Sequence, residues 1–542
     1  MFQEKIFNHD ILSSIVHNYT YFFTFLDMYV YAGYVLGILL LLGLPLIFCG
    51  TNEYLPFFSN EQKIFNYRKK SDWIGLSALL LSITAFFIIM IMQENSLFCN
   101  FDSMTIDYID SLKQGIKPVF GEWRFTPMSG IDYNFAFAVT NNYFMINCYV
   151  ALKQLFCLWL LYKLFCFMPV DKRLFMLAVI NFIPACFWMN NFIFQEQNIL
   201  IFVVLSLMSL NKYQQNSKSR YLFYFLITMN LAMYTKENVI LFYAGLGAWL
   251  ILTAVVNEKI TLNSFFHPLK TIKTLPVEWI MFWSFFVYST CWFLSTPIDE
   301  NRYLTTHSRD LAEVCNIYKC ELALNAIALI VMLVKVFRKQ FKNMNLLGEG
   351  SVFGSSLVTF FIVFKSHIVP ASDYILSYYL YLTAVFCTAY IFCNLSRKWL
   401  LGTFAIVVIA YSGWENYNIH LAQKGVYRRE LAEFIISKAK DEDMVIYMHS
   451  NQRLDYKWWK TMGWSASLKY AAPDARLHLK TDLDIYSFYH AEDSKFFRML
   501  LGKPEKGDYI LVNVTERPAF VPAPEYETVY QNKVYRLYYI GG

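Results

Sequence analysis

Long apolar runs, separated by short polar segments, make up most of residues 1–413. A helix that crosses the hydrocarbon core of a bilayer needs roughly 20 predominantly apolar residues. The runs that approach this length are 29–49, 73–93, 145–168, 174–190, 198–211, 221–235, 238–256, 277–296, 321–337, 352–365, 374–393 and 399–413. They predict an α-helical polytopic membrane core of about 12 spans, whose shorter members are expected to continue into their polar flanks.

Residues 414–542 follow a different pattern, which predicts a water-soluble α/β domain. Leu431, Phe434 and Ile435 form a helical stripe in a segment that ends near Asp441. Short apolar runs then predict strands at 444–448 and 509–514, and a hairpin that joins 528–530 to 534–539 through a turn at 531–533.

The distribution of Lys and Arg predicts the orientation of the core. Basic residues gather in alternate loops, such as those that contain Lys69, Arg173, Arg220, Lys270 and Arg338. Cytoplasmic loops carry such an excess, so these loops are expected to be cytoplasmic. The opposite set contains two long loops, 94–142 and 297–320, and the C-terminal domain, which are therefore expected to be extracytoplasmic.

Composition agrees with a membrane protein and excludes several other classes. Hydrophobic residues make up 56% of the 542 residues and charged residues only 16%, whereas soluble chains have about a quarter charged. The net charge of +6 comes from basic loops, not from a basic stripe, so no nucleic-acid partner is expected. The chain has no P-loop, dinucleotide fingerprint or nucleophile elbow, so nucleotide chemistry in the cytoplasm has no support.

The first long loop, 94–142, contains acids on both sides of Arg124. The acids are Asp102, Asp107, Asp110, Glu122 and Asp132. A carboxylate at the membrane boundary can deprotonate an acceptor hydroxyl, while a nearby Arg binds a phosphate through two hydrogen bonds. The simpler interpretation is a solvated loop in which Asp102 caps a helix, and the pattern alone leaves both open.

Other ionisable residues lie at the ends of predicted spans on the same side. They are Glu196, Lys236, Glu237, Arg302, His307 and Arg309. Such residues are functional candidates by default, and side chains that only reach toward water are the alternative. Asp102 and Glu196, together with water, could hold Mg²⁺ or Mn²⁺, which prefer oxygen ligands. Zinc is not expected, because the sequence has no His/Cys cluster.

This layout and several short matches resemble the GT-C superfamily of membrane glycosyltransferases, which includes lipid A aminoarabinose transferases and protein O-mannosyltransferases. The first-loop matches are Asp102, Tyr108, Gly115, Glu122, Arg124 and Pro127, and later matches are Glu196, Lys236 and Glu237. Two features differ from the family. Ser103 stands where many members have a second acid, so Asp107 could be the counterpart in place of Asp102, and an additional span precedes the loop.

The resemblance implies that the protein is an inverting glycosyltransferase. It is expected to lie in the inner (plasma) membrane of a bacterium. Its donor would be a sugar on polyprenyl phosphate, and its acceptor a glycolipid, glycan or protein outside the cytoplasm. Asp102, Asp107 and Glu196 would be the catalytic acids, and Arg124, Lys236 and Arg302 would bind the donor phosphate. Supporting roles would fall to Tyr108, Glu122, Glu237 and His307.

Two other functions remain open from the sequence. A transporter or flippase usually shows internal repeats and helices broken by Gly or Pro, which are not evident here. An O-antigen polymerase or ligase would also use a lipid-linked donor, but its outer loops are basic, whereas the first long loop here is rich in acids.

The role of Asp102 can be tested with Asp102→Asn. Asn caps a helix about as well as Asp but cannot act as a base at neutral pH. If Asp102 is the base, the folded variant should transfer sugar from a polyprenyl-phosphate donor about 10²–10⁴-fold more slowly than the wild type. A folded variant with nearly full activity would leave Asp102 as a cap and move the base to Asp107.

Overall fold

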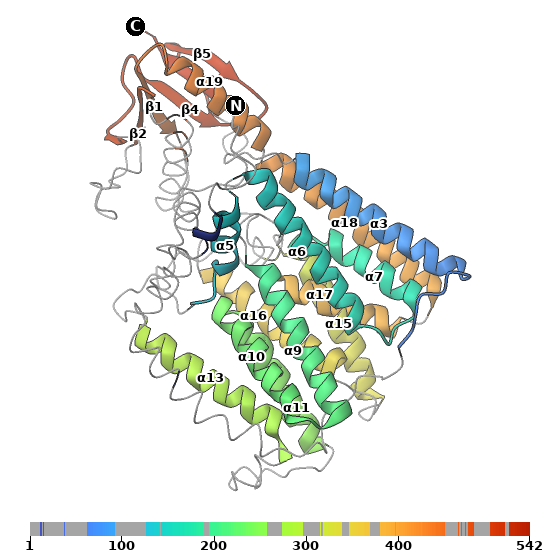
Figure 1. Cartoon of the computed structure of the whole chain (residues 1–542). Coiled ribbons are helices and arrows are strands. Elements are labelled where there is room, and N and C mark those ends of the chain that lie inside the picture. Colours follow the sequence, from blue (N-terminus) through green and yellow to red (C-terminus); the bar gives the residue numbers. More distant parts are fainter. Residues whose placement is uncertain are drawn as a thin grey trace. The chain divides into compact units, whose positions relative to one another are not determined.

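The computed structural model describes most of the chain outside its long loops. The described ranges are 62–92, 126–188, 195–256, 274–295, 318–338, 346–368, 380–449, 475–481, 499–514 and 520–541, with gaps at 141, 396 and 424, and a few single residues elsewhere. The chain forms two compact units, which divide between Asn416 and Tyr417 (Figure 1). Each unit is described by itself.

The first unit is built from helices. They are α3 (Lys70–Met92), α5 (Ile131–Val139), α6 (Tyr143–Leu164), α7 (Val170–Phe182), α8 (Pro184–Trp188), α9 (Glu196–Asn216), α10 (Ser219–Thr235), α11 (Val239–Val256), α13 (Pro276–Ser295), α15 (Lys319–Phe337), the π-helix η4 (Leu346–Gly350), α16 (Ser351–Ile368), α17 (Tyr381–Asn394) and α18 (Lys398–Gln423). Among the described residues, five helices are long and apolar enough to cross a membrane: α3, α6, α11, α13 and α15. The chain therefore has the helices of an integral membrane protein, and the number of about 12 spans stays a prediction.

One predicted run is not a single helix. The run 174–190 is interrupted where α7 ends at Phe182 and α8 begins at Pro184. Ile183 lies between them with φ −58° and ψ 134°. A residue before proline is driven out of the helical region by the proline ring, so the break follows directly from the sequence.

Two glycines let α11 and α16 pack with their backbones in close contact. A Cβ atom added to Gly245 would lie 2.5 Å from the Cα of Gly354, and one added to Gly354 would lie 2.5 Å from the carbonyl oxygen of Phe242. Small residues at helix contacts allow such an approach in membranes, where van der Waals packing replaces the hydrophobic effect between helices.

Buried hydrogen bonds connect other helices of this unit. Gln154 on α6 donates to Asn181 on α7 at 2.8 Å, and Asn181 donates to the hydroxyl of Ser82 on α3 at 2.8 Å. Asn325 on α15 donates to Thr359 on α16 at 2.9 Å. Each bond satisfies polar atoms that would otherwise be unpaired in an apolar interior, and so fixes which faces of the helices meet.

The second unit is an α/β domain, as predicted. Its helix α19 (Gly425–Lys438) is followed by the strands β1 (Met444–His449), β2 (Leu477–Thr481), β3 (Met499–Leu501), β4 (Tyr509–Asn513), β5 (Tyr526–Gln531) and β6 (Tyr535–Ile540). The strands form one sheet in the order β3-β2-β1-β4-β6-β5. The four strands from β3 to β4 are parallel, and β6 pairs antiparallel with β4 and β5. The predicted strands at 444–448 and 509–514 and the predicted hairpin are confirmed.

The core of this domain lies mainly between α19 and one face of the sheet. Leu431 and Ile435 of α19 are buried together with Ile446 on β1, Leu511 on β4 and Leu537 on β6. The helical stripe predicted from Leu431, Phe434 and Ile435 therefore faces the sheet, as its spacing requires.

A buried lysine connects β2 to the residue before β4. Lys480 donates to Asp508 at 2.8 Å and lies 3.3 Å from Glu505. Burial disfavours the charge of Lys480, but the two carboxylates outweigh burial and raise the pKa of Lys480 above its usual value. Lys480 therefore stays charged at neutral pH, and its ion pair with Asp508 connects β2 to the start of β4.

The glycine contact can be tested with Gly354→Ala. The added methyl group would meet the backbone of Phe242, so we expect the variant to lose about 1–3 kcal/mol of stability, as overpacked cores do. Thermal unfolding of the detergent-solubilised protein measures this loss. Gly402→Ala on α18 is the control, because nothing lies within 4 Å of its added Cβ and it should not destabilise the protein. Equal unfolding temperatures for Gly354→Ala and wild type would contradict the close packing.

Candidate functional site

The first turn of α9 begins with four consecutive polar residues, Gln195, Glu196, Gln197 and Asn198. Glu196 and Gln197 are fully buried, which is rare for such side chains. Glu196 occupies the first position of the helix, where the free backbone N–H groups favour a negative charge. The candidate site therefore includes this buried polar turn at the start of α9.

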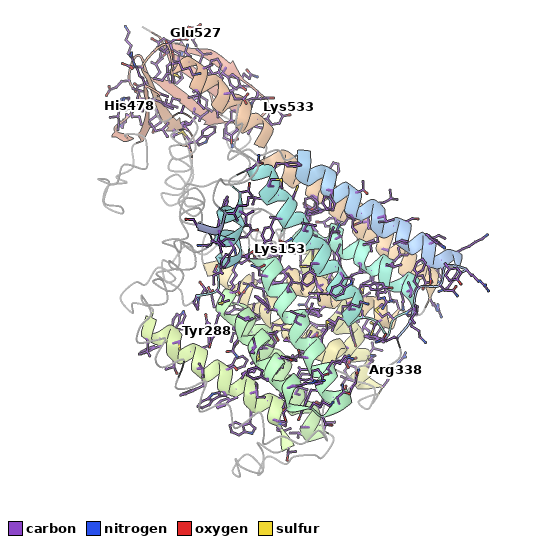
Figure 2. All side chains as sticks on the ribbon, viewed as in Figure 1. Lys153, Tyr288, Arg338, His478, Glu527 and Lys533 are labelled. Atoms are coloured by element: carbon purple, nitrogen blue, oxygen red, sulfur yellow. The ribbon has the colours of Figure 1, made fainter. Side chains whose placement is uncertain are left out.

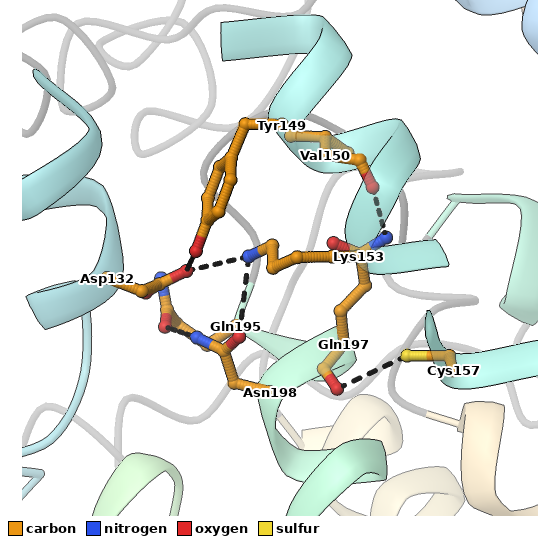
Figure 3. A network of polar contacts seen from close by, with 8 residues as sticks. All are labelled: Asp132, Tyr149, Val150, Lys153, Cys157, Gln195, Gln197 and Asn198. Atoms are coloured by element: carbon orange, nitrogen blue, oxygen red, sulfur yellow. Dashed lines mark hydrogen bonds and ion pairs between the residues drawn. The ribbon is translucent and has the colours of Figure 1, made fainter. Parts of the chain in front are cut away.

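Hydrogen bonds of three of these four residues hold this turn of α9 in place. Gln197 donates from Nε2 to the carbonyl oxygen of Val150 on α6 at 3.1 Å, and its own carbonyl oxygen accepts from the thiol of Cys157 at 3.6 Å (Figure 3). Asn198 donates to Oε1 of Gln195 at 3.0 Å. These bonds hold the turn in one orientation and leave Glu196 to face another helix.

Glu196 forms an ion pair with Lys236, the residue that ends α10. The ammonium group of Lys236 donates to Oε1 of Glu196. Oε2 of Glu196 is also buried, and it has no hydrogen-bond partner among the described residues. A charge buried without a partner is very unfavourable, and the ion pair with Lys236 offsets the burial of the Glu196 carboxylate.

A second ion pair lies beside the first, between α5 and α6. Lys153 donates to Oδ2 of Asp132 at 2.7 Å, and the hydroxyl of Tyr149 donates to the same oxygen at 2.9 Å (Figure 3). Nζ of Lys153 also lies 4.3 Å from the ring centroid of Tyr133 and 3.4 Å from Oδ1 of Asn198. Through Asn198, the second pair contacts the same turn of α9 that carries Glu196.

Lys153 lies among the helices, unlike Arg338 of the same unit (Figure 2). Its side chain is 8% exposed, and Figure 2 shows it in the interior, while Arg338 at the end of α15 points away from the helices. A buried lysine inside an apolar helix is kept only with a partner, and Asp132 supplies the compensating charge.

Tyr381, the first residue of α17, belongs to the same region. It is fully buried, and its hydroxyl has no hydrogen-bond partner among the described residues. The thiol of Cys186 donates to its carbonyl oxygen at 3.9 Å. The start of α9 and the end of α10 meet at the Glu196–Lys236 ion pair, and the start of α17 adds a further buried polar side chain.

The structure brings together two of the residues that the sequence singled out. Glu196 and Lys236, from separate predicted loops, form an ion pair. Glu237 follows Lys236 in the turn before α11 and is partly buried. The remaining predicted site residues lie outside the described residues: Asp102, Asp107, Tyr108, Glu122, Arg124, Arg302 and His307.

Sequence reasoning assigned no role to Asp132, Lys153, Tyr149 and Tyr381. Lys153 carried a usable signal, because it is a charged residue inside the apolar run 145–168. Asp132 was one acid among five in its loop, and nothing local indicates that it pairs with a residue 21 positions away. A buried tyrosine such as Tyr381 is ordinary in an aromatic-rich sequence, so no signal could have found it.

The predicted metal site is supported by a single oxygen atom. Oε2 of Glu196 could ligate Mg²⁺ or Mn²⁺, but Lys236 holds the other oxygen, and Asp102 lies outside the described residues. Among the described residues, no group of three or more His, Cys, Asp or Glu side chains is placed to hold a metal ion. The metal therefore stays a prediction, and the chemistry below does not use it.

Comparison with known proteins adds no identification, since neither a family model nor a curated protein matches the chain.

The second ion pair can be tested with Asp132→Asn. The substitution leaves Lys153 buried without a countercharge, so we expect a loss of about 3–5 kcal/mol in stability. The double variant Asp132→Asn with Lys153→Met removes both charges and should recover most of that loss in thermal unfolding. Lys212→Met, which changes an exposed lysine on α9, should have little effect. Unaltered stability of Asp132→Asn would show that the pair is not needed to neutralise Lys153.

Proposed function

We propose that the protein is an inverting glycosyltransferase that moves a sugar from a polyprenyl-phosphate carrier to an extracytoplasmic glycolipid, glycan or protein. The observation that carries this proposal is the buried Glu196–Lys236 ion pair at the ends of two apolar helices. A lipid-linked donor keeps its tail in the bilayer, so its phosphate needs a cation at a helix end, which Lys236 supplies.

The exposures of the two partners suit this role. The side chain of Lys236 is 15% exposed and that of Glu196 only 1%. The lysine could therefore reach a phosphate while the glutamate contacts it from the buried side. Charge-assisted hydrogen bonds of this kind are about twice as strong as neutral ones.

Sidedness forms part of the proposal. The pattern of Lys and Arg places the start of α9, the end of α10 and the start of α17 on the extracytoplasmic side, together with the first long loop and the C-terminal domain. Donor phosphate, acceptor and catalytic acid would then meet on one side of the membrane.

The reaction would proceed by direct displacement. Asp102, or Asp107 in its place, takes the proton of the acceptor hydroxyl as the acceptor oxygen attacks the anomeric carbon. The bond between that carbon and the phosphate oxygen breaks with inversion, and the polyprenyl phosphate leaves with the bonding electrons. Lys236, with Arg124 and Arg302, stabilises the charge that develops on the phosphate.

A transporter or flippase is the alternative from another class, since buried ion pairs also lie on transport pathways. An O-antigen polymerase or ligase would share the lipid-linked donor. The long acid-rich outer loop and the α/β domain favour a transferase, because an acceptor has to be held outside the membrane during the reaction.

The function can be tested with purified protein in liposomes that contain undecaprenyl phosphates bearing radiolabelled sugars. Acceptors come from an extract of cells that lack the gene, and mass spectrometry identifies the product. We expect transfer by the wild type and a loss of about 10²–10³-fold in Lys236→Met, which removes a cation from the leaving phosphate.

Two controls separate chemistry from folding. Lys212→Met should transfer sugar as the wild type does, because Lys212 is exposed and remote from the ion pair. The double variant Glu196→Gln with Lys236→Met removes both buried charges, so it should fold well and remain inactive. Movement of labelled lipid across the membrane without any glycosylated product would favour the flippase.

A further inference from the structure

The segment 62–69, which leads into α3, is held against the ends of two other helices. The backbone N–H of Lys63 donates to the carbonyl oxygen of Cys166, just after α6, at 2.9 Å. The buried guanidinium of Arg173, in the first turn of α7, donates to the carbonyl oxygen of Lys63 at 3.0 Å and to that of Tyr162 on α6 at 3.2 Å. The segment is therefore fixed through its backbone.

The turn between this segment and α3 is fixed by side chains of the helix. The backbone N–H of Asn66 donates to the carboxylate of Asp72 at 2.9 Å. The indole N–H of Trp73 donates to the carbonyl oxygen of Tyr67 at 2.8 Å. The side chains that this turn presents on the surface are therefore held in one place relative to α3.

Several of the exposed side chains at this end are apolar. Ile64 is 80% exposed and Tyr67 is 70% exposed. On α3, which Figure 1 shows in blue on the outside of the helical unit, Ile74 and Leu81 are 58% and 71% exposed. They lie two helical turns apart and so share one face. Such a face on a spanning helix contacts acyl chains, and tyrosine is enriched where these chains meet the headgroups.

Two basic side chains lie at the boundary of this apolar surface. Lys70 is the first residue of α3 and lies on the same face as Ile74, four residues further on. Arg68 comes two residues earlier, and its guanidinium carbon lies 5.9 Å from the ring centroid of Tyr67. Both basic side chains are exposed. A cation therefore stands at the end of the apolar face of α3, with a second cation next to it in the turn.

Two acids lie at the same end of the helical unit, and both are paired with another lysine. Lys69 lies 3.1 Å from Asp72 and 3.2 Å from Asp171. Arg68 and Lys70, on either side of Lys69 in the chain, form no ion pair with any described residue. This surface thus keeps two positive charges whose counterions have to come from outside the protein.

A phospholipid supplies both an apolar part and a counterion in the required order. Its acyl chains would contact the exposed face of α3, and its phosphate would lie beyond them, at the level of Lys70. A zwitterionic headgroup carries its own cation, whereas an anionic headgroup has a negative charge left for the protein. Basic residues next to a membrane-spanning helix attract anionic lipids, and arginine can bind a phosphate through two hydrogen bonds.

We propose that the segment 62–69 and the first turn of α3 form a binding site for an anionic phospholipid. Arg68 and Lys70 bind the phosphate of its headgroup. Ile64 and Tyr67 lie at the boundary between headgroups and acyl chains, and the acyl chains follow the exposed face of α3. Because the backbone of the segment is already fixed, the site is formed before the lipid arrives.

This site is separate from the candidate functional site. Val150, which accepts a hydrogen bond from Gln197 at the start of α9, lies near the start of α6. Tyr162, which accepts from Arg173, lies about 18 Å further along the same helix, at about 1.5 Å per residue. The inference therefore goes beyond the proposed function and does not depend on it.

The test compares two double variants in the purified, delipidated protein. Arg68→Gln with Lys70→Gln removes both charges of the site and keeps long polar side chains. Lys212→Gln with Lys218→Gln is the matched control, because it removes two exposed charges from the connection between α9 and α10, which is also expected to be cytoplasmic. Native mass spectrometry in a neutral detergent measures the dissociation constants of phosphatidylglycerol and phosphatidylcholine.

We expect the wild type to bind phosphatidylglycerol more tightly than phosphatidylcholine. Arg68→Gln with Lys70→Gln should bind phosphatidylglycerol about 30-fold more weakly, since each basic residue beside an anionic surface contributes about fivefold. Its binding of phosphatidylcholine should equal that of the wild type. The control should bind both lipids as the wild type does. Without lipid, all three proteins should unfold at the same temperature, because the changed side chains are exposed.

Three results would overturn the inference. Equal losses of phosphatidylglycerol binding in the two double variants would show a general attraction between a basic protein and an anionic lipid. Equal binding of the two lipids by the wild type would show that the surface does not recognise a negative headgroup. Displacement of phosphatidylglycerol by inorganic phosphate at the same concentration would show that the site takes a free anion and not a lipid.

Discussion

Polar groups buried among apolar helices must find their partners within the protein, and this constraint organises the helical unit. Gln154, Asn181 and Ser82 join three helices through side-chain hydrogen bonds. Lys335 and Tyr390 both donate to the buried carboxylate of Glu349 at 2.8 Å. Because each unpaired group would cost free energy, the helices can pack only in arrangements that satisfy these contacts.

The same constraint explains how ionisable groups can persist at the candidate site. Lys153 is neutralised by Asp132, and Glu196 by Lys236. Each pair joins residues from different helices, so the charges depend on the tertiary packing and also stabilise it. Oε2 of Glu196 is among the buried atoms that this pairing leaves without a hydrogen bond.

The C-terminal domain obeys a different rule, because its backbone bonds are satisfied between strands. Parallel strands such as β1, β2 and β4 need crossover connections, which run from one end of the sheet to the other. Such a connection is longer than the turn of a hairpin. Short apolar runs in the sequence predicted β1, β4 and the β5–β6 hairpin. The sequence did not predict β2 (Leu477–Thr481) and β3 (Met499–Leu501), which are short strands at one edge of the sheet.

The sequence by itself determined the helical character of the core, the position of most helices and the α/β character of the last domain. These follow from apolar run length and periodicity, which act locally. It also identified Glu196 and Lys236 as residues at helix ends. Only the tertiary structure decided that these two residues pair and that Asp132 meets Lys153. The physical reason is that hydrogen bonds and ion pairs join atoms by distance in space, and residues 40 or 21 positions apart along the chain carry no local sign of that distance.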